Sequence, residues 1–179
     1  TFGYKIQDGS LSGELIKPIH PMLTNALINN IAFKILSIIG FIPIWIVLFF
    51  LFKPDFSNVA LSGILLAIPA MILGFFIGYL LSATITALAF WTTRVYSIHE
   101  FYFALILLFS GQFVPLPLMP KLVQDIAQYL PFQLFLYYPI QLILGKLSTA
   151  QIIQGFASGV VWLGISMLLF NLVWRNGVK

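Results

Sequence analysis

The longest apolar stretch of the chain, residues 59–91, constrains the fold more than any other feature. As one α-helix these residues would extend about 50 Å, whereas the hydrocarbon core of a bilayer is about 30 Å thick. Such a helix must tilt, bend at Pro69 or project beyond the bilayer. Two further apolar stretches, about 31–52 and 151–174, are also long enough to cross a membrane. The sequence therefore predicts an all-α fold, a polytopic bundle of membrane helices.

The composition places the chain in the membrane class and excludes several other classes. Hydrophobic residues make up 60% of the 179 residues and charged residues 8%, against about 25% charged residues in soluble domains. The net charge is +4, but the basic residues are scattered, which favours topology markers over a nucleic-acid surface. There are no cysteines, so disulfides and thiol-ligated metals are excluded.

A broken segment, residues 110–145, lies between a short apolar stretch at 101–114 and the last long one. This segment contains six residues of the types that interrupt or end helices: Pro115, Pro117, Pro120, Pro131, Pro139 and Gly145. The pieces between them are shorter than the roughly 20 residues of a membrane helix. At membrane depth such a hairpin is tolerated only where protein or a water-filled cavity covers its backbone. We therefore expect a re-entrant or interfacial helical hairpin at 115–145 and four spans, about 31–52, 59–91, 101–114 and 151–174.

The first piece of this hairpin, residues 121–130, is amphipathic. Its apolar side holds Leu122, Val123, Ile126, Ala127 and Leu130, and its polar side holds Lys121, Gln124, Asp125 and Gln128. This pattern is typical of a helix that lies at an interface, and Pro120 suits the start of a helix. The second piece, 132–144, is expected to be broken at Pro139.

Residues 1–30 are polar by the standards of this chain and are predicted to form a cytoplasmic segment. Leu11, Leu15 and Ile16 are spaced to share one side of a short helix, which Pro18 would end. This pattern indicates a helix at the membrane surface or against a partner protein, and a plain loop between spans is the alternative. The chain starts at Thr1 rather than at Met, which suggests a piece of a longer protein.

Two pairs of glycines are spaced for close packing between membrane helices. They are Gly74 with Gly78 and Gly155 with Gly159, and each pair lies on one side of its helix. Three hydroxyl residues follow the first pair, at Ser82, Thr84 and Thr86. Their side chains are expected to form hydrogen bonds between helices, or to carbonyl groups of their own helix.

Motifs for catalysis or nucleotide binding are absent from the sequence. There is no GxxxxGK[ST], no HExxH and no paired acidic motif, so we expect no catalytic, cofactor or metal site in this chain. His20 and His99 are far apart and near predicted interfaces, which favours a hydrogen-bonding role for each. No ionisable residue lies mid-span and Glu100 lies only at a span entrance, which argues against an ion-coupled carrier.

The basic residues near the ends of the spans predict the orientation. With four spans, one side of the membrane holds Lys5, Lys17, Lys34, Arg94, Arg175 and Lys179. The other side holds Lys53, Lys121 and Lys146. We therefore expect both termini of this segment to be cytoplasmic and the hairpin to lie on the outer side.

Two stretches resemble a known family of transport proteins. The first is Ile6-Gln7-Asp8-Gly9-Ser10-Leu11 with Leu15-Ile16-Lys17-Pro18, similar to the pattern I-x-x-G-x-L … L-L-x-P. The second runs from Phe109-Ser110-Gly111 through Pro115 and Pro120 to Leu130-Pro131-Phe132, similar to SG-x-x-x-P … P … LP-F. Both patterns resemble the membrane-spanning subunits of ABC transporters, type-2 exporter family, and they occur in that family's order.

The resemblance implies roles for both stretches. The family has six helices per subunit, so the four expected spans would be the third to sixth. A cytoplasmic segment that docks on a separate ATP-binding subunit would include Asp8, Gly9, Leu11, Glu14, Leu15, Lys17 and Pro18. An outer gate between the last two spans would include Ser110, Gly111, Pro115, Pro117, Pro120, Pro131 and Phe132.

The function implied by the resemblance is that of a permease subunit in an ATP-driven exporter of a bacterial plasma membrane. Its partners would be an ATP-binding subunit that carries the ATP, a second permease copy or homologue, and membrane lipids. The chain itself would bind no cofactor and no nucleic acid and would catalyse no bond chemistry. The alternatives are a structural or assembly membrane protein, an ATP-independent transporter and an integral membrane enzyme, for which the sequence lacks a polar cluster.

Overall fold

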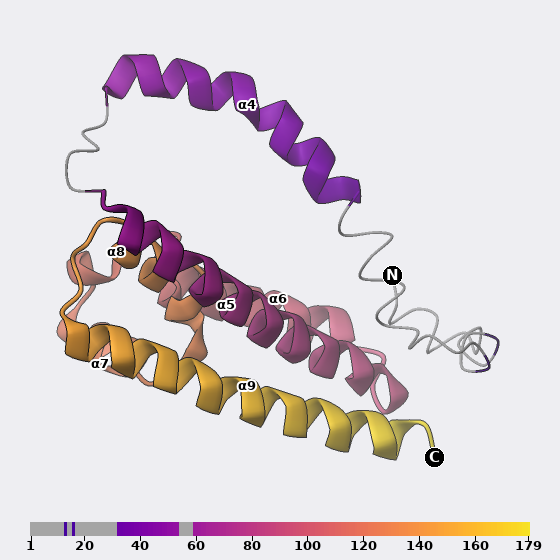
Figure 1. Cartoon of the computed structure of the whole chain (residues 1–179). Coiled ribbons are helices and arrows are strands. Elements are labelled where there is room, and N and C mark those ends of the chain that lie inside the picture. Colours follow the sequence, from indigo (N-terminus) through magenta and orange to yellow (C-terminus); the bar gives the residue numbers. More distant parts are fainter. Residues whose placement is uncertain (1–12, 14–15, 17–31, 54–58) are drawn as a thin grey trace. The chain divides into compact units, whose positions relative to one another are not determined.

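The computed structural model describes residues 13, 16, 32–53 and 59–179, which are drawn as coloured ribbon in Figure 1. The chain divides into two units, Thr1–Ser57 and Asn58–Lys179. Helices and turns make up the described residues, and no strand occurs among them. The all-α membrane fold expected from the sequence is thereby confirmed. All seven residues of the expected docking segment lie outside the described residues.

The described part of the first unit is dominated by one helix, α4 (Ala32–Phe52). Residues Lys34–Phe52 have a mean hydropathy of 2.8, so they are apolar and long enough to cross a membrane. Pro43 lies inside the helix, where it removes one backbone hydrogen bond, and the ribbon bends along its length (Figure 1). Lys53, at a φ of 43°, ends the helix.

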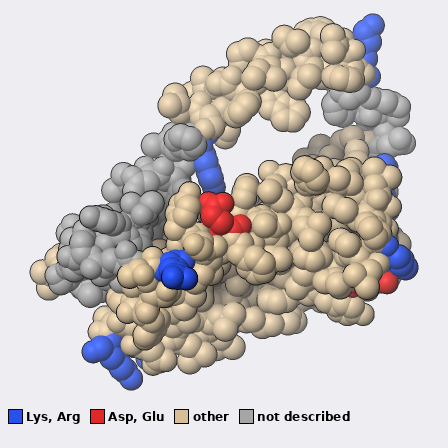
Figure 2. All heavy atoms as spheres, turned by 180° about the vertical axis from the view of Figure 1, so that it is seen from behind, with Lys and Arg blue, Asp and Glu red and all other residues tan. Residues whose placement is uncertain are grey.

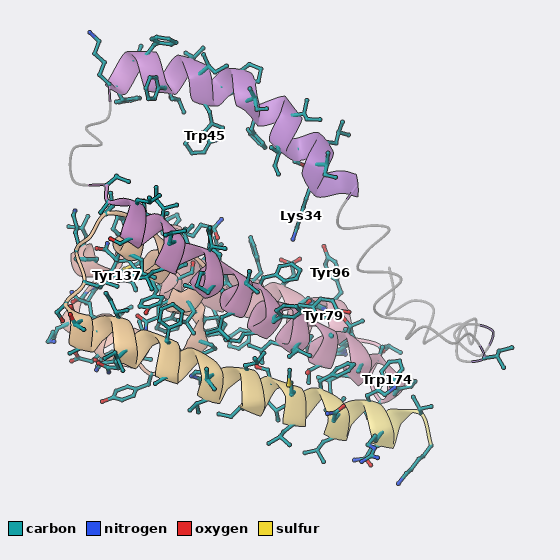
Figure 3. The ribbon with its side chains drawn as sticks, in the orientation of Figure 1. Lys34, Trp45, Tyr79, Tyr96, Tyr137 and Trp174 are labelled. Carbon is teal, nitrogen blue, oxygen red and sulfur yellow. The ribbon has the colours of Figure 1, made fainter. Side chains whose placement is uncertain are left out.

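Two long helices form the frame of the second unit. They are α5 (Leu61–Ala87), which continues as the 3₁₀-helix η2 (Leu88–Phe90), and α9 (Thr149–Gly177). Both run in the same direction side by side (Figure 1), so that Gly159 contacts Leu73 near their middle. At their far ends Gly177 contacts Phe90, whose ring centroid is 5.8 Å from that of Trp174. Figure 3 shows Trp174 at this end of α9. Both helices are long and apolar enough to cross a membrane.

The short helix α6 (Val95–Phe109) runs back along α5 and corrects two expectations. It begins six residues before the expected span 101–114. The reason is that His99 contacts Thr86 of α5 and so belongs to the helix-to-helix contact. At about 22 Å, α6 is also shorter than the bilayer core. Of the described helices, three rather than four are long enough to cross a membrane.

Between α6 and α9 the chain forms a hairpin of four short helical pieces. They are η3 (Leu116–Leu118), α7 (Lys121–Ala127), η4 (Pro131–Phe135) and α8 (Tyr137–Ile143). Pro115 and Pro120 immediately precede η3 and α7, and Pro131 begins η4. Pro139 does not break the second piece as expected. It lies in the first turn of α8, where its missing N–H has no helical acceptor, and the break falls at Leu136, which has φ −143° and ψ −56°.

The hairpin shares two hydrophobic clusters with the long helices. The α5–α9 cluster consists of Ala67, Ala70, Ile77, Leu134, Tyr138 and Leu142. The α6 cluster consists of Phe109, Leu116, Ala127 and Phe132. Phe135 packs against both clusters. The second half of the hairpin is therefore held by α5 and α9, and the first half by α6.

The outer surface of the second unit suits a membrane environment. Large apolar side chains on the free sides of α5 and α9 are exposed, among them Leu65, Ile72, Phe75, Val160 and Leu168. Figure 2 shows that Lys, Arg, Asp and Glu cover only a small part of the face drawn there. Helices that keep apolar residues on their outer side as well as their inner side are typical of membrane bundles.

Candidate functional site

The tip of the hairpin lies halfway along both long helices. We define this tip as η4 together with residues 129–130. A Cβ at Gly74, midway along α5, would lie 2.5 Å from the carbonyl oxygen of Leu134. Trp162, midway along α9, donates a 3.0 Å hydrogen bond from Nε1 to the carbonyl oxygen of Tyr129. This midpoint is about 20 Å along the axis from the first residue of each long helix. The hairpin therefore reaches the middle of both long helices.

Four glycines let the hairpin approach the long helices this closely. On α5, a Cβ at Gly63 would overlap the carbonyl oxygen of Leu142, and the ring of Phe135 lies 3.4 Å from the Cβ position of Gly78. Gly74 contacts the hairpin backbone as described above. On α9, a Cβ at Gly155 would overlap the ring of Tyr138. Three of the four glycines in the two pairs singled out in the sequence contact only the hairpin. The fourth, Gly159, contacts Leu73 of α5 as well as Leu134 of the hairpin.

Side chains satisfy the irregular backbone of the hairpin. The Gln124 amide donates to the carbonyl oxygen of Met119 at 2.8 Å, and Trp162 donates to Tyr129. The Tyr138 hydroxyl donates to the carbonyl oxygen of Ile152 on α9 at 2.7 Å. The first two contacts satisfy carbonyl oxygens of the hairpin itself, and the third joins the hairpin to the backbone of α9.

The expected gate residues fall into two groups. Ser110, Pro131 and Phe132 are buried, and Gly111 has a φ of +79°, a conformation that favours glycine. The Phe132 ring lies 6.0 to 6.2 Å from the rings of Tyr102 and Phe109 on α6. The second group, Pro115, Pro117 and Pro120, is exposed. The structure thus buries the first group where the tip of the hairpin meets the end of α6, and it leaves the three prolines on the surface.

A row of polar contacts joins α5 to α6. Thr86 Oγ1 lies 3.0 Å from His99 Nε2, and the Tyr102 hydroxyl donates to the carbonyl oxygen of Gly78 at 3.4 Å. Thr84 and Thr86 also donate to carbonyl oxygens of α5 itself, at 2.7 and 2.9 Å. The sequence left open whether these hydroxyl groups bind another helix or carbonyl oxygens of their own helix. Both kinds of hydrogen bond occur, and Thr86 makes both of them.

Two glutamines near the tip are functional candidates that the sequence did not single out individually. Gln128 follows α7 and is exposed, and Gln133 lies in η4 and is half-buried. The Gln133 amide donates to the carbonyl oxygen of Gln128 at 3.2 Å. The sequence placed Gln128 on the polar side of an interfacial helix. The contacts that put this end of α7 near the middle of α9 come from residues more than thirty positions away, so no local pattern could show them.

Metal-binding clusters are missing from the described part of the chain: no group of three His, Asp or Glu residues lies close enough together to hold an ion. Apart from the α5–α6 row and the hydrogen bond from Tyr138 to α9, the polar contacts described above satisfy carbonyl oxygens of the hairpin. The arrangement is that of a partly polar hairpin held in place by α5, α6 and α9.

Comparison with known families decides the identity. A family model described as ABC-2 family transporter protein matches residues 1–179. The chain belongs to the ABC-2 family of transporter proteins. As an ABC-2 protein it is an integral membrane permease component of ABC-type transport. The resemblance noted in the sequence is thereby confirmed, and comparisons with curated proteins and with solved structures gave no match.

Proposed function

We propose that this ABC-2 permease forms the translocation pathway of an ATP-driven exporter, together with a second permease copy or homologue and separate ATP-binding subunits. The observation that supports this most is the hairpin, which reaches the middle of α5 and α9 and is packed on their glycines. A re-entrant element fixed at this depth can block a path through the bundle in one state and open it in another.

The packing indicates how movement would reach the hairpin. Its second half is bound to α5 and α9 through contacts with glycines that leave no space for independent sliding. Its first half is bound to α6, which meets α5 through the row of polar contacts. ATP-driven closure of the partner subunits would displace the segment at 8–18, and a rigid α5–α8–α9 body would then carry the hairpin with it. The permease would then have two states that differ in their affinity for the cargo, and ATP binding by the partner would shift the equilibrium between them.

The distribution of charge supports the proposed orientation. Arg94, Arg175 and Lys179 lie at the shared end of α5, α6 and α9, whereas Lys121 and Lys146 lie in the hairpin region. Asp125 pairs with Lys121 at 2.8 Å. By the positive-inside rule the first end is cytoplasmic and the hairpin is on the outer side of the plasma membrane.

The chain's own chemistry leaves ATP hydrolysis to the partner. Its sequence holds no P-loop, so ATP would be bound and hydrolysed by the separate subunit and no cofactor by this chain. The many exposed apolar and aromatic side chains along the bundle suit an amphiphilic cargo.

Co-purification tests this function. The full-length protein, tagged and extracted from its native membrane in mild detergent, is expected to bring down a stoichiometric P-loop protein that hydrolyses ATP. A tagged, unrelated membrane protein of the same host serves as the control. Absence of such a partner across several detergents would contradict the proposal and favour a structural or ATP-independent role.

A further inference from the structure

We propose that Gln128 and Gln133 form a hydrogen-bonding contact for the transported molecule at the midpoint of the path across the membrane. This inference rests on the proposed transport function and names the part of the hairpin that meets the cargo. It follows from the depth of the tip, the exposure of Gln128, the partial exposure of Gln133 and the character of the surface around them.

The depth of the pair is fixed by two independent contacts. Leu134, next to Gln133, lies against Gly74 halfway along α5. Tyr129, next to Gln128, accepts the hydrogen bond from Trp162 halfway along α9. Both helices are longer than the bilayer core, so their middles lie near its midplane wherever the surplus length projects equally on both sides.

At that depth the two amides are short of partners. The Gln133 amide donates to the carbonyl oxygen of Gln128, and the Gln128 amide makes no hydrogen bond to any residue that the structure describes. Polar side chains within the membrane face the interior of a bundle or a water-filled cavity, because hydrocarbon cannot hydrogen-bond them. We infer that the exposed side of Gln128 faces a hydrated path rather than lipid.

The surroundings of the pair indicate the class of ligand. An amide both donates and accepts hydrogen bonds and carries no charge. The neighbouring charges, Lys121 and Asp125, pair with each other one to two turns earlier on α7, and the nearby exposed side chains Ile126, Tyr129 and Leu136 are largely apolar. The pair therefore suits the uncharged hydroxyl- or amide-bearing head of an amphiphile.

Cysteine labelling tests the exposure of the pair to water. The 179 residues hold no cysteine, so Gln128→Cys and Gln133→Cys can each be introduced singly into the full-length protein and treated with a charged, membrane-impermeant methanethiosulfonate reagent in intact cells and in inverted vesicles. Val160→Cys is the matched control. Val160 is 64% exposed at nearly the depth of Trp162, but two residues earlier it points about 200° away from it.

We expect both glutamine variants to react at least about tenfold faster than Val160→Cys from one side of the membrane, because only a hydrated thiol forms the reactive thiolate. Equal rates at all three positions would overturn the inference. A spontaneous disulfide between two copies of Gln128→Cys would also overturn it, because the pair would then lie in a permease–permease contact.

Protection from labelling tests the ligand class. Octyl glucoside below its micellar concentration has an uncharged, hydroxyl-rich head, and we expect it to slow the labelling of Gln128→Cys at least about threefold through occupancy of the site. Octyl sulfate at the same concentration is expected to protect less, and equal or absent protection by the two amphiphiles would contradict the ligand class. If the cysteines are labelled rapidly but no ATPase co-purifies, the proposed contact stands and the exporter function is refuted. If an ATPase co-purifies but the cysteines are not labelled, the exporter function stands and the proposed contact is refuted.

Discussion

The ring of Tyr138 lies directly against the backbone of Gly155, so that a Cβ at position 155 would overlap the ring. The hydroxyl of the same tyrosine donates a 2.7 Å hydrogen bond to the carbonyl oxygen of Ile152, one turn earlier on α9. This contact joins the returning limb of the hairpin to a helix that is long enough to cross the membrane. It also makes the packing of the hairpin directly testable by substitution.

Substitution of Gly155 by alanine is expected to destabilise the protein by about 1–3 kcal/mol, because the added methyl group forces the ring of Tyr138 to move in a close-packed contact. Gly164→Ala in the same helix is the matched control, since nothing lies within 4 Å of a Cβ there. The control is expected to be neutral or slightly stabilising. Thermal unfolding of both variants in detergent measures the difference, and equal melting temperatures would show that the hairpin does not pack on α9 in this way.

Substitution of Trp162 by phenylalanine is expected to loosen the tip of the hairpin while the apolar packing of the ring is largely kept. The exposed carbonyl oxygen of Tyr129 loses the hydrogen bond from Trp162, whose net contribution is about 0.5–1.5 kcal/mol. Hydrogen exchange of peptides covering residues 126–136 is expected to become faster, with peptides from the α5 middle unchanged. Unaltered exchange at 126–136 would mean that this bond does not hold the tip.

Two buried serines are expected to respond to alanine in opposite directions. Ser166 on α9 is fully buried and its Oγ has no hydrogen-bond partner among the described residues, so Ser166→Ala is expected to be neutral or stabilising by about 1 kcal/mol. Ser110 is equally buried, but its Oγ accepts a 3.3 Å hydrogen bond from the backbone N–H of Gln112. Ser110→Ala is therefore expected to destabilise, and melting temperatures that fall equally in both variants would contradict this assignment.

The proposed orientation predicts opposite labelling of the two ends of the second unit. A cysteine at Lys121, whose side chain is 83% exposed, is expected to react with an impermeant reagent added to intact cells. A cysteine at Thr93, exposed in the turn before α6, is expected to react only in inverted vesicles. The reverse pattern would place the hairpin in the cytoplasm.

The sequence was most informative where hydropathy and length alone decide the structure. The frame helices α5 and α9 follow from apolar stretches that are too long for any other environment, and the prolines at 115, 120 and 131 do mark the starts of hairpin pieces. These features are local, since each depends on a run of neighbouring residues.

The features that sequence analysis missed depend on contacts between distant residues. The structure begins α6 at Val95 rather than at residue 101, and His99 in this added part meets Thr86 of α5, a contact that hydropathy cannot show. Pro139 is accommodated in a first turn whose start was not visible in the sequence. The depth of Gln128 is set by a hydrogen bond between Trp162 and the next residue, Tyr129, although the amphipathic pattern of α7 alone indicated a helix at the membrane surface.

The most direct test of the account is the ATP hydrolysis rate of the purified complex with both Leu11 and Leu15 replaced by aspartate. If the segment at 8–18 couples this ABC-2 permease to its ATP-binding subunit, the double variant still inserts into the membrane but loses most of the bound ATPase and its activity, because two carboxylates would replace the apolar docking side. Ile35→Asn, Leu36→Asn on α4 is the control for a general loss of fold. Full retention of the ATPase and of wild-type hydrolysis in the Leu11 and Leu15 variant would contradict the coupling on which the account depends.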